Sequence, residues 1–313
     1  MNTRQLGKTD ARITEIGLGT NAVGGHNLYA GISEEEGIRL VERAVELGIN
    51  FFDTADVYGT GRSEELTGKA LGPNKNDVFI ATKGGNLMGR DGADNSPAYL
   101  REALEGSLRR LNRDYIDLYY IHKPDGKTPP EEAFGTLMRF KEEGKIRFAG
   151  VSNFSLEQLQ QAMKAGPVDA IQNEFHLFHR APETDIIPFC EQHGISFIPW
   201  GPIAFGLLTD STKYNENMQL AENDWRRNLP YFSAENFPET LRIRRELKTV
   251  AQKREVPLSH LAMRWVLSHP AVASTITGAK NEYQVEENAR AVGWDLDAEE
   301  LARIDEITGA ATS

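Results

Sequence analysis

The sequence predicts one α/β domain over residues 1–313, in which parallel strands alternate with helices and close into a barrel. Short β-branched or aromatic runs alternate with longer segments of helical periodicity. No Pro/Gly/Ser-rich linker or low-complexity tract divides the chain, and 313 residues suit a barrel of eight strand–helix units. The predicted strands lie near Ile16, Phe51, Phe79, Ile116, Phe148, Ala170, Phe197 and Val272.

The segment before the first barrel strand predicts a β-hairpin. Residues 3–15 contain two short extended pieces separated by a turn sequence at residues 7–10. The first helix is expected after a capping box formed by Ser33 and Glu36, because the apolar residues that follow recur at helical spacing. These residues are Ile38, Val41 and Val45.

Two later helices have equally clear signals. A second capping box, at Ser155 and Gln158, predicts the start of one of them. The other follows Pro97, where leucines recur at helical spacing. These leucines are Leu100, Leu104, Leu108 and Leu111.

The connection between the last two strands is unusually long, about 75 residues. It contains an irregular polar segment at 210–237 and then extra helices expected around 242–254 and 259–268. Long loops in compact domains are usually functional or disordered. Because the loops at the carboxyl ends of barrel strands form active sites, we expect this insertion to cover a ligand.

Composition limits the classes of partner. With 35 basic and 46 acidic residues the formal charge is −11, which argues against non-specific binding to nucleic acid or anionic membranes. The single cysteine, Cys190, excludes an internal disulfide. The longest apolar stretch, 198–208, is too short and too rich in proline and glycine to span a membrane. The first residues lack the apolar core of a signal peptide, so a cytoplasmic location is expected.

Four polar residues lie just past the ends of predicted strands: Asp53, Tyr58, Lys83 and His122. The carboxyl ends of parallel barrel strands meet at one face, so we expect the four side chains to form a proton-transfer set. A nearby ammonium favours the phenolate of a tyrosine, whose ordinary pKa is about 10, and a carboxylate would keep that ammonium charged. Such a tyrosine is a general acid for a carbonyl oxygen. Each residue alone is explained as well by a buried ion pair or a capping histidine.

No side chain supplies the attacking group. The sequence has neither a Gly-x-Ser-x-Gly nor a His-Glu-x-x-His motif. His176 and His179 lack a third ligand in sequence reach, which favours loop contacts over a metal site. A cofactor is therefore the expected donor. Since the Rossmann and P-loop glycine motifs are also missing, a dinucleotide would have to be held in another way.

Five short motifs occur in order along the chain. They are Asp53-Thr54-Ala55-x-x-Tyr58-Gly59, Thr82-Lys83, Ile116-Asp117-Leu118-Tyr119-x-Ile121-His122-x-Pro124-Asp125, Gly150-Val151-Ser152-Asn153-Phe154 and Gly278-Ala279-Lys280. Together they resemble the aldo-keto reductase superfamily over essentially the whole chain. The opening at 16–25 is most similar to bacterial NADPH-dependent members of the inositol-operon and general-stress type. The resemblance implies a (β/α)8 TIM barrel with an N-terminal β-hairpin and extra helices near the C-terminus.

The resemblance also implies roles. Tyr58 is the proton donor, Lys83 and Asp53 tune it, and His122 orients the carbonyl, while a nicotinamide supplies the hydride. The resemblance implies that Trp200 stacks on the nicotinamide and that Ser152, Asn153 and Gln172 contact its carboxamide. It implies that Gln284, Glu287 and Asn288 contact the adenosine. Gly278 and Lys280 are implied to bind the cofactor beside these three residues.

Cofactor choice follows from the basic residues. A 2′-phosphate prefers an arginine fork or a lysine, and Arg226 and Lys280 are the candidates, which favours NADPH/NADP over NADH. The chain also departs from its relatives in ways that would alter the substrate pocket. It has Phe175 and His176 where relatives often have Tyr-Asn, and Lys123 where they tend to have an aromatic.

Three functions remain open. The first is an NADPH-dependent reductase of small aldehydes or ketones. The second is a nucleotide-sensing regulatory subunit, similar to channel-associated β subunits of the same superfamily. The third is a phosphosugar isomerase or aldolase that uses Lys83 for a Schiff base or His122 as a base. Tyr58 and Asp53 disfavour the third, since an adjacent carboxylate would hold the lysine charged. The natural substrate and the oligomeric state are not predicted.

Overall fold

The computed structural model describes residues 1–24, 31–72, 77–222 and 224–309 of the protein. Its centre is a parallel sheet in the order β10-β3-β4-β5-β6-β7-β8-β9. The strands are β3 (Ile16–Gly19), β4 (Phe51–Asp53), β5 (Phe79–Gly84), β6 (Ile116–Ile121), β7 (Ile146–Ser152), β8 (Ala170–Gln172), β9 (Ser196–Phe197) and β10 (Thr275–Gly278).

Backbone contacts between β9 and β10 close this sheet into a barrel. The Ile276 amide donates to the Pro199 carbonyl at 3.0 Å. Isolated parallel bridges link Phe197 with Val272 and Trp200 with Ile276. The predicted strand near Val272 was therefore placed slightly too early: Val272 forms a single bridge, and the strand itself begins at Thr275.

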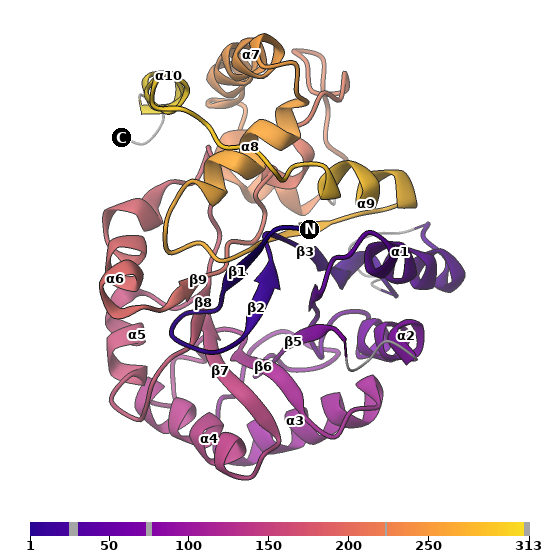
Figure 1. Ribbon diagram of the computed structural model, residues 1–313, viewed down its shortest axis with the longest axis vertical. Helices are drawn as coiled ribbons and strands as arrows, with labels where there is room; N and C mark the ends of the chain where they lie inside the picture. The colour runs from indigo at the N-terminus through magenta and orange to yellow at the C-terminus, as the bar shows by residue number, and fades with distance from the viewer. Residues whose placement is uncertain (25–30, 73–76, 223, 310–313) are drawn as a thin grey trace.

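Helices surround the barrel (Figure 1). They are α1 (Glu34–Glu46), α2 (Arg62–Leu71), α3 (Pro97–Leu111), α4 (Pro130–Glu142), α5 (Leu156–Ala162), α6 (Ile186–His193), α7 (Phe237–Lys253), α8 (Leu258–Leu267), α9 (Glu282–Ala289) and α10 (Ala298–Thr308). Both predicted capping boxes are confirmed, at Ser33 before α1 and at Ser155 before α5. The α/β barrel class is confirmed as well.

The N-terminal hairpin is formed by β1 (Thr3–Gln5) and β2 (Arg12–Thr14), and it lies across one end of the barrel (Figure 1). The Gly7 amide donates to the Ser196 hydroxyl at the start of β9, and the Thr14 amide donates to the Asn50 side chain just before β4. The hairpin therefore covers the amino ends of the strands. Its apolar side chains, Leu6 and Ile13, are fully buried in the barrel interior.

The long insertion after β9 contains short 3-10 turns and then the two predicted helices. The turns are η4 (Ala204–Gly206), η5 (Trp225–Asn228) and η6 (Pro230–Phe232). Two more 3-10 turns lie outside the insertion: η1 (Thr20–Ala22) follows β3, and η3 (Ala181–Thr184) precedes α6. Helix α7 begins at Phe237, earlier than predicted. Within the described ranges, no helix has both the length and the apolar character that a membrane span requires. Gly25, the last residue of the opening motif, lies outside the described residues.

Candidate active site

Asp53 is the last residue of β4, and the turn between β4 and α2 carries Tyr58. This turn is fixed to the neighbouring strand β5, since the amides of Thr54 and Asp56 donate to the carbonyls of Ala81 and Lys83. Gly59 allows the turn to pass close to another segment: its φ is +56°, and a Cβ atom there would lie 1.9 Å from the Gly24 carbonyl oxygen. The half-buried Tyr58 side chain is thereby held at the carboxyl end of the barrel.

Lys83 and Asp53 form a buried ion pair beside Tyr58. The Lys83 ammonium donates to the Asp53 carboxylate at 2.6 Å and to the Thr54 carbonyl at 2.8 Å, and it lies 5.2 Å from the centre of the Tyr58 ring. Burial pushes the pKa of Lys83 down, but the charge of Asp53 and the Tyr58 phenol outweigh it, so the pKa is raised. Lys83 therefore stays protonated at neutral pH. The other carboxylate oxygen of Asp53 accepts a hydrogen bond from the Gln172 amide at 2.8 Å.

His122 lies directly after β6 and also approaches Tyr58. The two rings are 6.0 Å apart and nearly perpendicular. Burial, followed by the charges of Lys83 and Lys123, holds the pKa of His122 well below its ordinary value. The imidazole is therefore neutral at pH 7, so it can donate a hydrogen bond but does not carry an extra proton. Its Nδ1 is buried and has no hydrogen-bond partner among the described residues.

A chain of hydrogen bonds joins the Lys83–Asp53 pair and the backbone of His122 to Trp200. The Trp200 indole N–H donates to the Asn153 side chain at 3.2 Å, and the Asn153 amide donates to the His122 carbonyl at 3.0 Å. Asn153 also donates to the Ser152 hydroxyl, which in turn donates to the Gln172 carbonyl at 2.8 Å. Gln172 then reaches Asp53. One continuous polar network therefore links the Lys83–Asp53 pair to the predicted nicotinamide contacts.

Comparison with known proteins gives the family: residues 15–308 match the model of the Aldo/keto reductase family. The chain belongs to this family. The aldo-keto reductase YhdN of Bacillus subtilis is 34% identical over 315 residues, which cover 98% of this chain and 93% of that protein. The Schizosaccharomyces pombe protein named aldo-keto reductase yakc, NADP(+), is 33% identical over 296 residues, covering 91% of this chain and 85% of that protein.

Solved structures agree over the whole length. The glycerol dehydrogenase AKR11B4 from Gluconobacter oxydans superposes with a TM-score of 0.91 and 36% identity, covering 99% of this chain and 96% of that chain. The predicted resemblance and the predicted (β/α)8 architecture are thus confirmed. This aldo-keto reductase is an NAD(P)-dependent oxidoreductase that acts on carbonyl groups.

Helix α9 of the reductase carries the three residues predicted to contact adenosine. Asn288 donates to the Gly278 carbonyl at 3.3 Å, and the Gln284 side chain accepts from the Lys280 amide at 2.8 Å. Glu287 is paired with Arg290. The contacts of Asn288 and Gln284 shape the loop that joins β10 to α9.

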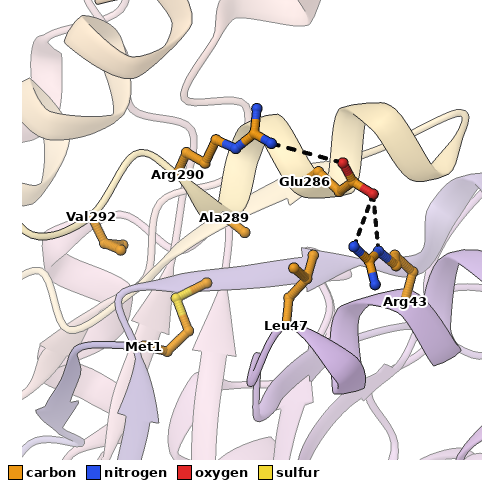
Figure 2. Close-up of a pocket in the computed structure, with 7 residues that line it drawn as sticks. All are labelled: Met1, Arg43, Leu47, Glu286, Ala289, Arg290 and Val292. Atoms are coloured by element: carbon orange, nitrogen blue, oxygen red, sulfur yellow. Dashed lines mark hydrogen bonds and ion pairs between the residues drawn. The ribbon is translucent and has the colours of Figure 1, made fainter.

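The opposite side of α9 is anchored to α1. Figure 2 shows Glu286 between Arg43 of α1 and Arg290. The Arg43 guanidinium lies 3.0 Å from the Glu286 carboxylate. The hollow of about 260 Å³ beneath this ion pair is lined by side chains of the outer helices and the N-terminus, including Met1, Leu47, Ala289 and Val292. It is separate from the proton-transfer set, and the ion pair fixes the position of α9.

Three basic side chains gather near the loop between β10 and α9. Arg226, on η5, donates to the Tyr214 hydroxyl at 3.4 Å, and the Lys213 ammonium lies 4.7 Å from the centre of the Tyr214 ring. Burial, together with the charges of Lys213 and Arg226, lowers the pKa of Lys280. The sequence singled out Arg226 and Lys280 but not Lys213, which stands alone in an irregular polar loop.

The chain's own residues fit a nicotinamide dinucleotide. The Trp200 ring is half-exposed and oriented by Asn153, and a Cβ atom built on Gly278 would meet no heavy atom within 4 Å. The basic cluster suits a phosphate. Trp200, Asn153 and Ser152 would hold the nicotinamide end, and Lys280 with α9 would hold the adenosine end.

Two predictions about the substrate pocket need revision. Phe175 does not line a pocket: it is fully buried and packs at 4.9 Å from Trp265 in the outer core. His176 is also fully buried, and its ring nitrogen lies 2.9 Å from Glu174 and 3.3 Å from the Tyr231 hydroxyl. His176 thus joins the insertion to the end of β8. No group of three or more metal-ligating side chains occurs in the described part of the chain.

Proposed function

We propose that this enzyme reduces small aldehydes or ketones to alcohols with NADPH, and that Tyr58 donates the proton. The observation that carries the proposal is the contact between the charged, buried Lys83–Asp53 pair and the Tyr58 ring. A nicotinamide bound against Trp200 would supply the hydride.

Tyr58 needs help to act as an acid at neutral pH. The buried Lys83 ammonium stabilises the phenolate that remains after the proton has left, because it lies beside the ring. Asp53 keeps Lys83 charged, and Gln172 fixes the position of Asp53. The proton therefore leaves Tyr58 at low cost, and solvent can restore it after product release.

His122 has a different task. Since its imidazole is neutral, it offers one N–H to the carbonyl oxygen without competing with Tyr58 as a proton source. The Asn153 side chain binds both the His122 backbone carbonyl and the Trp200 indole. This one side chain would therefore align the carbonyl carbon of the substrate with the nicotinamide.

The choice of NADPH rests on the basic cluster. Arg226 and Lys280, together with Lys213, would surround a 2′-phosphate with positive charge. The predicted contacts of Gln284, Glu287 and Asn288 with adenosine, of Gly278 with the neighbouring phosphate, and of Ser152 and Gln172 with the carboxamide belong to the same proposal.

Replacing the proton donor gives the most direct test. We expect Tyr58→Phe to lower kcat by at least about 100-fold, the range typical of general acids, while the dissociation constant for NADPH stays within about twofold. Steady-state oxidation of NADPH with an aromatic aldehyde and tryptophan fluorescence titration measure the two quantities. Lys83→Met should resemble Tyr58→Phe. A Tyr58→Phe variant that retains most of its kcat would refute the role of Tyr58.

The same experiments separate the reductase from its alternatives. Cofactor binding without turnover over a panel of carbonyls would favour a nucleotide-sensing role. A Schiff-base aldolase needs an uncharged lysine, whereas the Asp53 carboxylate and the raised pKa of Lys83 keep this ammonium protonated.

A further inference from the structure

Arg226, the proposed ligand of the 2′-phosphate, already has an anionic partner within its own turn. Its Nε and Nη2 atoms donate to the two oxygens of the Asp224 carboxylate at 2.9 and 2.5 Å. This is a bidentate ion pair. Both side chains are about one-fifth exposed. The Asp224 carboxylate also accepts from the Arg226 amide at 3.0 Å and so caps η5.

A phosphate monoester and a carboxylate make the same kind of bidentate contact with arginine. Asp224 therefore occupies the edge of the guanidinium that a 2′-phosphate would seek. It also places one negative charge beside the positions where a dianion would bind. Lys213 and Lys280, whose charges act on each other and on Arg226, would attract that dianion to the same place.

We propose that Asp224 weakens the preference for NADPH by standing in for the 2′-phosphate on Arg226. This inference rests on the proposed function, in which Arg226 binds the 2′-phosphate. With NADH bound, Arg226 stays paired with Asp224, so the charge of its guanidinium remains compensated. The enzyme can therefore bind the cofactor that lacks the 2′-phosphate. With NADPH bound, the phosphate must share Arg226 with Asp224 or displace it, so part of the preference for NADPH is lost.

Asp224→Asn tests this role with little structural change, because asparagine caps a helical turn as well as aspartate does. Fluorescence titrations would give the dissociation constants for NADP+ and NAD+, which differ only in the 2′-phosphate. We expect Asp224→Asn to tighten NADP+ binding about fivefold and to change NAD+ binding less than twofold. The gain should disappear in the Asp224→Asn/Arg226→Ala double variant.

Two controls distinguish the possible outcomes. Glu216→Gln removes a negative charge from the same insertion, but Glu216 is paired with Arg245 on the surface, so NADP+ binding should not change. Arg226→Ala alone should weaken NADP+ much more than NAD+. If it weakens both equally, the proposed phosphate site fails. If it weakens NADP+ selectively but Asp224→Asn leaves NADP+ binding unchanged or weaker, the phosphate site stands and the role of Asp224 is overturned.

Discussion

At the scale of single residues, the carboxyl group of Asp56 is an unusual group near Tyr58. It is fully buried on the same turn, and neither of its oxygens has a hydrogen-bond partner within the described residues. Burial, and then the charge of Glu64, raise the pKa of Asp56 to about 8, although Arg110, the neighbouring Val57 backbone amide and Lys83 act in the opposite direction. Asp56 is therefore mostly neutral at pH 7.

This pKa predicts how stability depends on pH. The folded-state pKa lies above the ordinary value of 3.8, so between these limits the folded protein holds one proton more than the unfolded chain. The associated stability is complete below about pH 4 and is lost as the pH rises through 8. We expect Asp56→Asn to remove this loss, which is about 1.4 kcal/mol per pH unit, and to make the protein more stable than wild type at pH 9.

Urea denaturation at pH 5, 7 and 9 would measure this effect. Asp10→Asn is the matched control, since the Asp10 side chain is 86% exposed and its removal should leave the pH dependence of stability unchanged. If the wild type and Asp56→Asn show parallel curves, Asp56 is ionised in the folded protein at neutral pH.

The residues of the proton-transfer set could be predicted because each one lies at, or shortly after, the end of a recognisable strand. The sequence could not show that Gln172 donates to Asp53, since a pairing across 119 residues of chain depends on the closed barrel. Lys213 and Asp224 were missed for another reason. They lie in a segment without periodicity, where the sequence does not indicate which charges face each other.

At the scale of elements, the turn from β4 to α2 determines where Tyr58 points. Gly59 has a left-handed backbone, and a side chain there would collide with the Gly24 carbonyl. We expect Gly59→Ala to lower the free energy of unfolding by at least about 2 kcal/mol and to reduce kcat, because the turn must move and Tyr58 moves with it.

Gly144→Ala is the matched control for this prediction. Gly144 also has a positive φ, +71°, but a Cβ atom there meets no heavy atom within 4 Å. Its replacement should cost about 1 kcal/mol of stability and leave kcat unchanged. Denaturation and steady-state kinetics on both variants would decide, and equal effects on kcat would show that the Gly59 turn does not orient Tyr58.

Helix starts were the most predictable elements, because capping boxes combine a local hydrogen bond with a change of periodicity. Both boxes are present with the expected partners. The last strand was harder to place, since Val272 and Thr275 lie in one run of small and β-branched residues and only the register with β3 determines which residues pair. The start of α7 was missed because Phe237 and the proline after it precede any clear helical repeat.

At the scale of the whole molecule, buried ion pairs tie the hairpin to the last part of the barrel. Glu15, at the end of the hairpin, is paired with Arg264 of α8 at 2.9 Å and with Arg4 at 2.8 Å. Arg4 also donates to the carbonyls of Leu267 and Val272. Segments about 250 residues apart in the sequence are thus held together.

Arg264→Ala should therefore destabilise the protein by about 3 kcal/mol or more, because Glu15 would remain buried with less compensation. The control is Arg245→Ala, which breaks an ion pair with both side chains more than 60% exposed and should cost less than about 1 kcal/mol. Midpoints of guanidinium unfolding would compare the two. Similar midpoints would mean that Arg4 alone satisfies Glu15.

The organisation of residues 1–313 as one domain stays a prediction.

The hairpin also has a consequence for the order of events in a catalytic cycle. Leu6 and Ile13 fill the amino end of the barrel, so both ligands must enter and leave through the same mouth. The ligand that binds deeper in the barrel has to bind first and leave last. For the proposed function we expect a compulsory sequence in which the nucleotide precedes the carbonyl, and this order would make the nicotinamide the deeper ligand. Product inhibition would reveal it: the oxidised nucleotide should compete with the reduced nucleotide and not with the carbonyl, whereas competition with both would indicate random entry.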